Sequence, residues 1–108
     1  MTDFDKILID LKRGVVLIAK EHAGEYAEEA LEDGERFIHA VKDDLKRWTE
    51  LLAEGKLTKE EFTFLVGGKK DLAEMKALGQ KGLAKGMVQG FQSALLKLIF
   101  EAVGRIIV

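Results

Sequence analysis

Apolar residues recur in steps of three and four along this chain, and this spacing is the feature that most limits its possible folds. Such a spacing places the apolar side chains on one face of an α-helix, whereas a half-buried β-strand needs strict alternation. No strand pattern and no internal repeat is visible, so we predict an all-α fold in a single helical domain spanning residues 1–108. In the first half the series comprises Phe4, Leu8, Leu11, Val15, Ile18, His22, Tyr26, Ala30, Gly34, Phe37, Val41, Leu45, Trp48 and Leu52.

The series crosses three glycines, Gly14, Gly24 and Gly34, without a change of phase. The pattern alone therefore leaves open whether residues 4–54 form one bent helix or two. Each interior glycine costs a helix about 1 kcal/mol relative to alanine, and Gly24 is the best candidate for a break. Gly55 stands where a left-handed residue is needed to end the helix.

A capping box predicts a short helix in the middle of the chain. In this motif the hydroxyl of Thr58 and the carboxylate of Glu61 accept hydrogen bonds from each other's free backbone N–H groups. We expect a helix over residues 59–66, ended by the two glycines 67–68. From Lys69 onward the helical spacing continues to near the C-terminus. We therefore predict an antiparallel bundle of two long helices joined by a short one.

Two segments, residues 5–22 and 87–108, are apolar over more than half of the helix circumference. A hairpin of two helices alone covers neither segment fully. Three ways of covering these segments are possible: a break at Gly24 that closes a monomeric bundle, a second subunit, or a membrane surface. We predict that oligomerisation, as a homodimer, completes the bundle. The interface that we expect consists of Leu95, Leu98, Ile99, Ala102, Val103, Ile106, Val15 and Ile18.

Gly82, Gly86 and Gly90 recur every four residues. Glycines in a helix are tolerated most easily where the bare backbone lets another helix come close. If the chain folds back at the short helix, Gly90 meets Gly34 and Gly86 meets Phe37. We therefore predict a close helix crossing at these four glycines. A glycine-lined ligand groove is the alternative, and a break in the helix is the simplest explanation of such a series.

Charge is unevenly shared between the two halves of the chain. Residues 1–54 carry fourteen acidic and eight basic side chains, and residues 55–108 carry five acidic and nine basic ones. The halves should attract each other, within one chain or between subunits. An acidic patch between Glu21 and Glu35 is either a binding surface or the complement of the later lysines. The net charge of −2 gives no drive toward nucleic acid.

No group of residues typical of catalysis or metal binding is visible. The chain has no cysteine and a single serine, Ser93. His22 and His39 both lack the Glu-x-x-His spacing of di-iron bundles. We therefore expect no enzymatic activity, no metal and no cofactor. The aromatic residues Phe62, Phe64, Phe91 and Phe100 fit core packing.

The middle of the chain resembles two known motifs. Residues 50–61 are similar to an EF-hand calcium loop, but Leu52 stands where an oxygen ligand is needed. The same stretch resembles the short bacterial oligomerisation hairpin called SHOCT, which implies self-association. That resemblance ends after Phe62, and the capping box accounts for most of the same residues. The residues that resemble this hairpin are Leu51-Leu52, Gly55, Thr58 and Glu60-Glu61-Phe62.

These observations predict a non-enzymatic structural or interaction module that self-associates. We expect it to be cytoplasmic, because no targeting signal is visible. The alternative is a peripheral membrane or lipid-binding protein that uses its apolar C-terminal helix. The polar stripe of that helix, Lys97, Glu101 and Arg105, is narrow and not basic, which disfavours a membrane surface. A small-molecule carrier or bundle enzyme ranks last, because no polar groups converge beside the glycines.

Overall fold

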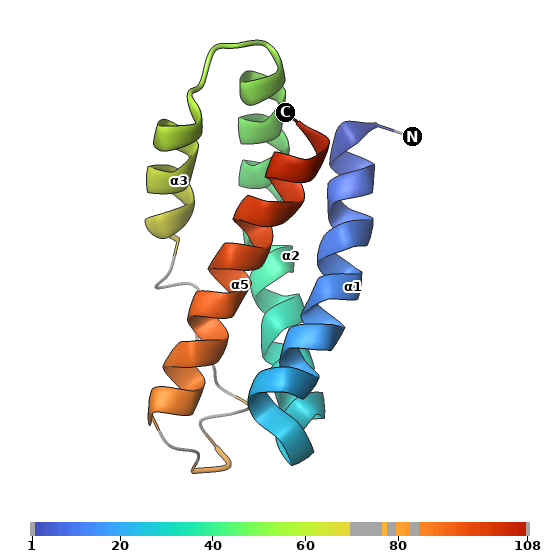
Figure 1. The fold of residues 1–108 in the computed structure, drawn as a ribbon, viewed down its shortest axis with the longest axis vertical. Helices are drawn as coiled ribbons and strands as arrows, with labels where there is room; N and C mark the ends of the chain where they lie inside the picture. The colour runs from blue at the N-terminus through green and yellow to red at the C-terminus, as the bar shows by residue number, and fades with distance from the viewer. Residues whose placement is uncertain (1, 70–76, 78–79, 83–84, 108) are drawn as a thin grey trace.

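The computed structural model describes residues 2–69, 77, 80–82 and 85–107, and this part of the chain is built from helices and their connections (Figure 1). The prediction of an all-α fold is confirmed. The elements are α1 (Asp3–Ala23), the 3-10 helix η1 (Gly24–Tyr26), α2 (Ala27–Ala53), α3 (Lys59–Gly67) and α5 (Lys85–Ile106).

The chain breaks at Gly24, so its first half forms two helices. Gly24 ends α1 with a φ of 53°, and its backbone N–H donates to the carbonyl of Lys20. A positive φ costs glycine little, whereas a side chain would strain the backbone there. After η1 the chain reverses, and α2 runs back beside α1 (Figure 1).

Capping boxes begin both α1 and α3. Thr2 and Asp5 form the first, and Thr58 and Glu61 form the second. The predicted short helix over residues 59–66 is confirmed, with its end one residue later at Gly67. Local hydrogen bonds of this kind depend on few neighbours, which explains why the sequence predicts them well.

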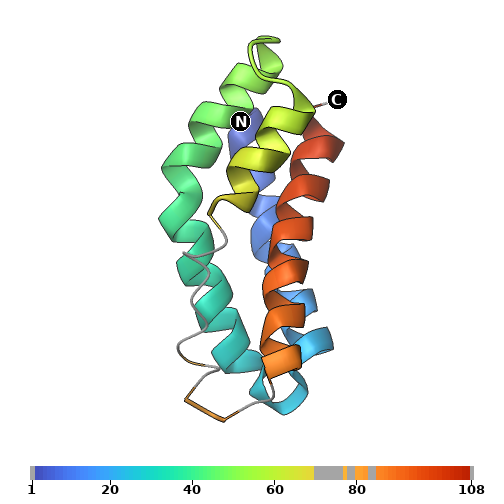
Figure 2. The same cartoon turned by 90° about the vertical axis from the view of Figure 1, so that its left-hand side faces the viewer.

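Helix α1 packs against both α2 and α5 and runs opposite to each, whereas α2 and α5 point the same way (Figures 1 and 2). Along the α1–α5 contact, Gly14 lies opposite Leu98 and His22 lies beside Gly90. Asp10 accepts hydrogen bonds from Arg105 near the other end. The predicted approach of Gly90 to Gly34 is therefore not formed, because α1 and not α2 faces Gly90.

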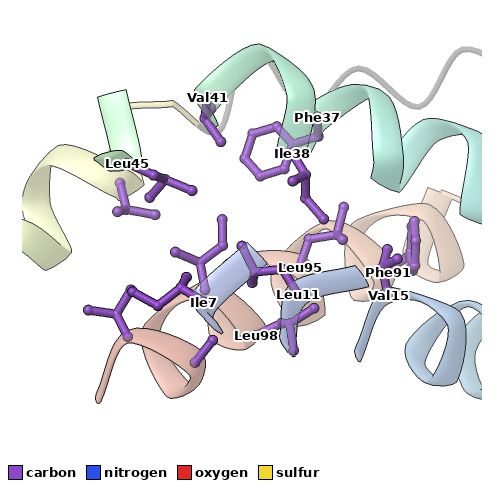
Figure 3. Close-up of a cluster of buried hydrophobic side chains, with 14 of the residues drawn as sticks. Ile7, Leu11, Val15, Phe37, Ile38, Val41, Leu45, Phe91, Leu95 and Leu98 are labelled. Atoms are coloured by element: carbon purple, nitrogen blue, oxygen red, sulfur yellow. The ribbon is translucent and has the colours of Figure 1, made fainter. Parts of the chain in front are cut away.

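The core lies where these three helices meet, and large side chains from all of them point into it (Figure 3). Each helix contributes side chains that are at most 1% exposed. These include Ile7, Leu11 and Val15 of α1, Phe37, Val41 and Leu45 of α2, and Phe91, Leu95 and Ile99 of α5.

Most residues predicted for a subunit interface fill this core instead. Ile18 and Ile106 are only partly buried. The break at Gly24 explains the difference from the prediction, because it gives α1 a neighbour on two sides within one chain. A second copy cannot reach the buried residues while the chain keeps this fold. The buried members of the predicted set are Val15, Leu95, Leu98, Ile99, Ala102 and Val103.

Of the four glycines predicted to meet at one crossing, Gly34 lies at a close helix approach, but this approach is to Val15 of α1 and not to Gly90. A Cβ at Gly34 would lie 2.5 Å from the Cγ2 of Val15, so α1 and α2 do approach closely there. Gly86 would meet nothing within 4 Å, and Gly90 only His22 at 3.8 Å. Gly82 adopts a φ of 67° in a turn before α5 begins, so the helix predicted from Lys69 onward is not continuous. The rest of that prediction falls on residues 70–76, 78–79 and 83–84, outside the described residues.

Ion pairs join the acidic first half to the basic second half within one chain. Lys69 contacts Asp44 at 2.8 Å and Lys81 contacts Glu29 at 3.6 Å. The predicted attraction between the halves therefore acts inside the chain. No helix in the described ranges is both long enough and apolar enough to cross a membrane.

Candidate functional site

The short helix α3 packs against the rest of the molecule through its two buried side chains, Phe62 and Val66, and the ring of Phe62 lies between two other aromatic rings. Phe62 packs edge to face against Trp48 of α2, with ring centroids 6.3 Å apart and planes at 79°. It meets Phe100 of α5 in the same way, at 6.3 Å and 81°. Such pairs contribute about 0.5–1.5 kcal/mol each beyond the area that they bury. Phe62 and Val66 are the buried residues of α3 and define its inner side.

A mainly apolar groove of about 420 Å³ lies between α3, the end of α2 and the end of α5. Gly104 forms part of its wall, and a Cβ there would meet nothing within 4 Å, so the missing side chain leaves the groove open. Concave apolar surfaces of this size are typical of binding sites. The lining residues are Leu52, Ala53, Leu57, Lys59, Phe62, Thr63, Phe100, Val103, Gly104 and Ile107.

Phe64 stands on the outer side of α3 and is 81% exposed. Residues two apart on a helix point about 200° away from each other, so Phe62 and Phe64 cannot both face the core. The prediction that Phe64 packs in the core is therefore wrong. The spacing of two residues between Phe62 and Phe64 was the sequence signal that the two rings lie on opposite sides of the helix. Phe64 borders a shallow hollow that Leu57 and Leu65 also line.

Charged side chains accompany these two apolar features. Lys59 lines the groove, and Glu60 and Glu61 line the hollow beside Phe64. Glu61 is engaged in the capping box with Thr58. Lys59 and Glu60 form no ion pair with any residue that the structure describes. A basic side chain, Lys59, therefore lies at the groove, and an acidic one, Glu60, lies beside the exposed ring. Both charges are available to a partner.

The other residues singled out in the sequence do not form a second site of this kind. Of the residues predicted for an interface, Val103 alone lines the groove. His39 is exposed in a separate hollow between α1 and α2, beside Lys12 and Glu35. Among the residues that the structure describes, no three histidine or acidic side chains gather as a metal site would require.

The acidic patch is partly used inside the chain. Asp33 is 1% exposed, and its Oδ1 accepts hydrogen bonds from the backbone N–H of Ala77 at 3.0 Å and from Arg36 at 3.2 Å. Glu29 pairs with Lys81. Buried carboxylates persist where donors satisfy them, as here. The sequence signal for Asp33 was its place on the apolar stripe, three residues after Ala30 and next to Gly34.

No protein-family model, no curated protein and no solved structure matches this chain. What the molecule does must be inferred from its residues and their geometry.

Proposed function

We propose that this chain is a non-enzymatic helical interaction module that self-associates, with a dimer as the favoured assembly. The observation that carries the proposal is the exposed ring of Phe64 beside the open apolar groove. A large aromatic side chain in water leaves unrealised about 1.5–3 kcal/mol that burial would contribute. Aromatic residues next to concave apolar surfaces are also the residues that dominate binding at protein interfaces.

The contact surface in this proposal differs from the one expected from the sequence. Val15, Leu95 and Ile99 are covered by their own chain. Apolar side chains that stay on the surface are therefore the ones available to a partner. Around α3 these are Phe64 and the partly exposed apolar residues of the groove, among them Leu52, Leu57 and Phe100.

The groove supports binding better than catalysis. Among the described residues that line it, Lys59 and Thr63 are the polar ones. Enzyme sites need a nucleophile or base with a second group to orient it, and no such pair is present in this lining. The lipid-binding alternative has less support as well. The apolar side of α5, including Leu95 and Ile99, faces the core and would have to leave it to enter a lipid layer.

The test is the absolute mass in solution, measured by light scattering on a sizing column. The concentration series should run from about 1 µM to about 1 mM, because a small contact gives weak association. We expect the mass to rise from that of one chain, 12.0 kDa, toward twice that value. A single-chain mass at every concentration would contradict self-association. Co-sedimentation with vesicles would then decide whether the lipid-binding alternative replaces it.

A further inference from the structure

The geometry points to one mode of docking, in which two copies exchange their Phe64 rings. Each ring enters the groove of the other copy, and α3 forms the centre of the interface. This inference rests on the proposed self-association and adds the residues that would carry it. Three observations support it: the size of the groove, the position of both features on one helix, and their charges.

The groove has room for a phenyl ring. An engineered apolar cavity of roughly 150 Å³ binds benzene, and the groove, at about 420 Å³, is larger and open to the surface. Its walls include the rings of Phe62 and Phe100, which can pack against an incoming aromatic side chain. Gly104 adds no side chain that would obstruct the entry.

Ring and groove lie on neighbouring sides of the same short helix. Lys59 and Thr63 line the groove, and Phe64 follows Thr63 at about 100° around the helix. A twofold dimer places the same patch of both subunits in contact, so that residue i meets j and j meets i. A twofold axis beside α3 therefore brings each Phe64 to the opposite groove. One patch supplies both halves of the contact.

The charges identify a second copy as the occupant. Lys59 lies at the groove, and Glu60 lies beside Phe64. The exchange therefore brings Glu60 of each copy toward Lys59 of the other, where opposite charges attract. A partner for this groove needs an exposed aromatic ring with an acidic neighbour, and the chain itself presents that combination. Opposite charges set the orientation of such contacts as well as their strength.

The first experiment compares Phe64→Ser with Leu17→Ser in the same light-scattering series. Both side chains are largely exposed, at 81% and 66%, so neither substitution should disturb the fold, which circular dichroism verifies. Leu17 lies on α1, away from the proposed contact. We expect Phe64→Ser to raise the dimer dissociation constant at least about thirtyfold, as loss of a central aromatic residue does. Leu17→Ser should leave it unchanged.

The second experiment reverses the two charges. Lys59→Glu and Glu60→Lys should each raise the dimer dissociation constant between about threefold and tenfold, because like charges then meet across the interface. The double variant restores opposite charges and should recover most of the wild-type affinity. If the dissociation constant of the double variant is no lower than that of the more weakened single variant, the proposed pairing of Lys59 with Glu60 across the interface is wrong.

The outcomes separate this inference from the proposal beneath it. A wild-type chain that stays at the mass of one copy overturns both. A wild-type dimer whose affinity is unchanged by Phe64→Ser overturns the exchange of rings and leaves self-association standing. A dimer that is lost in Phe64→Ser and kept in Leu17→Ser supports the exchange.

Discussion

The α1–α5 contact and the attachment of α3 use their apolar residues in opposite ways. Where α1 and α5 pack together, the large apolar side chains between them are buried, and Gly14 lies directly opposite Leu98. On α3 two buried side chains, Phe62 and Val66, hold the helix in place, while Phe64 is exposed to solvent. A long helix that is apolar on two sides must find two neighbours. A short helix turns few residues inward, and the remaining apolar side chains stay free for a partner.

The largest expected effect is a difference in stability loss between removing a buried core ring and removing the exposed ring of α3. Phe91→Ala removes a fully buried side chain and should lower the free energy of unfolding by about 3–5 kcal/mol. Phe64→Ala should change it by less than about 0.5 kcal/mol, since its ring is exposed. Urea unfolding followed by circular dichroism measures both, at a concentration where the chain is one copy. Similar losses in the two variants would refute the distinction between the regions.

The next comparison tests which glycine marks a close helix approach. A methyl group at Gly34 would clash with Val15, which is β-branched and held to one rotamer in a helix. Gly34→Ala should therefore cost about 1–3 kcal/mol of stability, more than the gain in helix propensity. Gly90→Ala adds an ordinary contact at 3.8 Å and should stabilise the chain by about 0.5–1 kcal/mol. A loss of stability in Gly90→Ala would show that the α1–α5 contact is tighter there than we infer.

A smaller effect tests whether α3 opens independently of the other helices. Thr58→Ala removes the side chain that accepts from the backbone N–H of Glu61 at 3.0 Å, which should cost α3 about 1 kcal/mol. Amide hydrogen exchange should then accelerate about fivefold in α3 and stay unchanged in the core helices. Thr2→Ala removes the equivalent cap of α1 and serves as the control. Faster exchange in all helices of Thr58→Ala would mean that α3 unfolds only with the whole molecule.

The smallest effect concerns the ion pair that fastens the end of α3 to α2. A hydrogen bond from Lys69, with added attraction from Arg47, holds the pKa of Asp44 below its ordinary value of 3.8. Because the folded-state pKa is depressed, the stabilisation is complete above the unfolded pKa and is lost as pH falls through the folded pKa. Asp44→Asn should therefore reduce stability at pH 7, by less than about 1 kcal/mol because the pair is partly exposed.

The same variant gives its own control at low pH. As the pH falls through the depressed pKa of Asp44, the wild-type carboxyl becomes protonated, and the difference from Asp44→Asn at low pH should shrink toward zero. Urea unfolding at both pH values measures the gap. A gap of equal size at pH 7 and at low pH would exclude the ion pair as its cause.

Local features of the fold were predictable because they depend on nearby residues. The capping box of Thr58 and Glu61 predicted α3 to within one residue, and Gly24 was the correct candidate for a break. The candidate site was less predictable. Its exposed ring, Phe64, follows from helix geometry once Phe62 is known to face inward, but the sequence alone does not say which of the two rings is buried.

The sequence by itself determined that the chain is helical, where several helices begin and end, and that two segments need apolar neighbours on more than one side. Periodicity and capping are local, and they act before any tertiary contact forms. Tertiary structure alone decided that these neighbours come from the same chain. The turn at Gly24 sets α1 between α2 and α5, so Leu95 and Ile99 became core residues. The apolar surface that we propose for a partner therefore lies around α3, because burial depends on which helices meet.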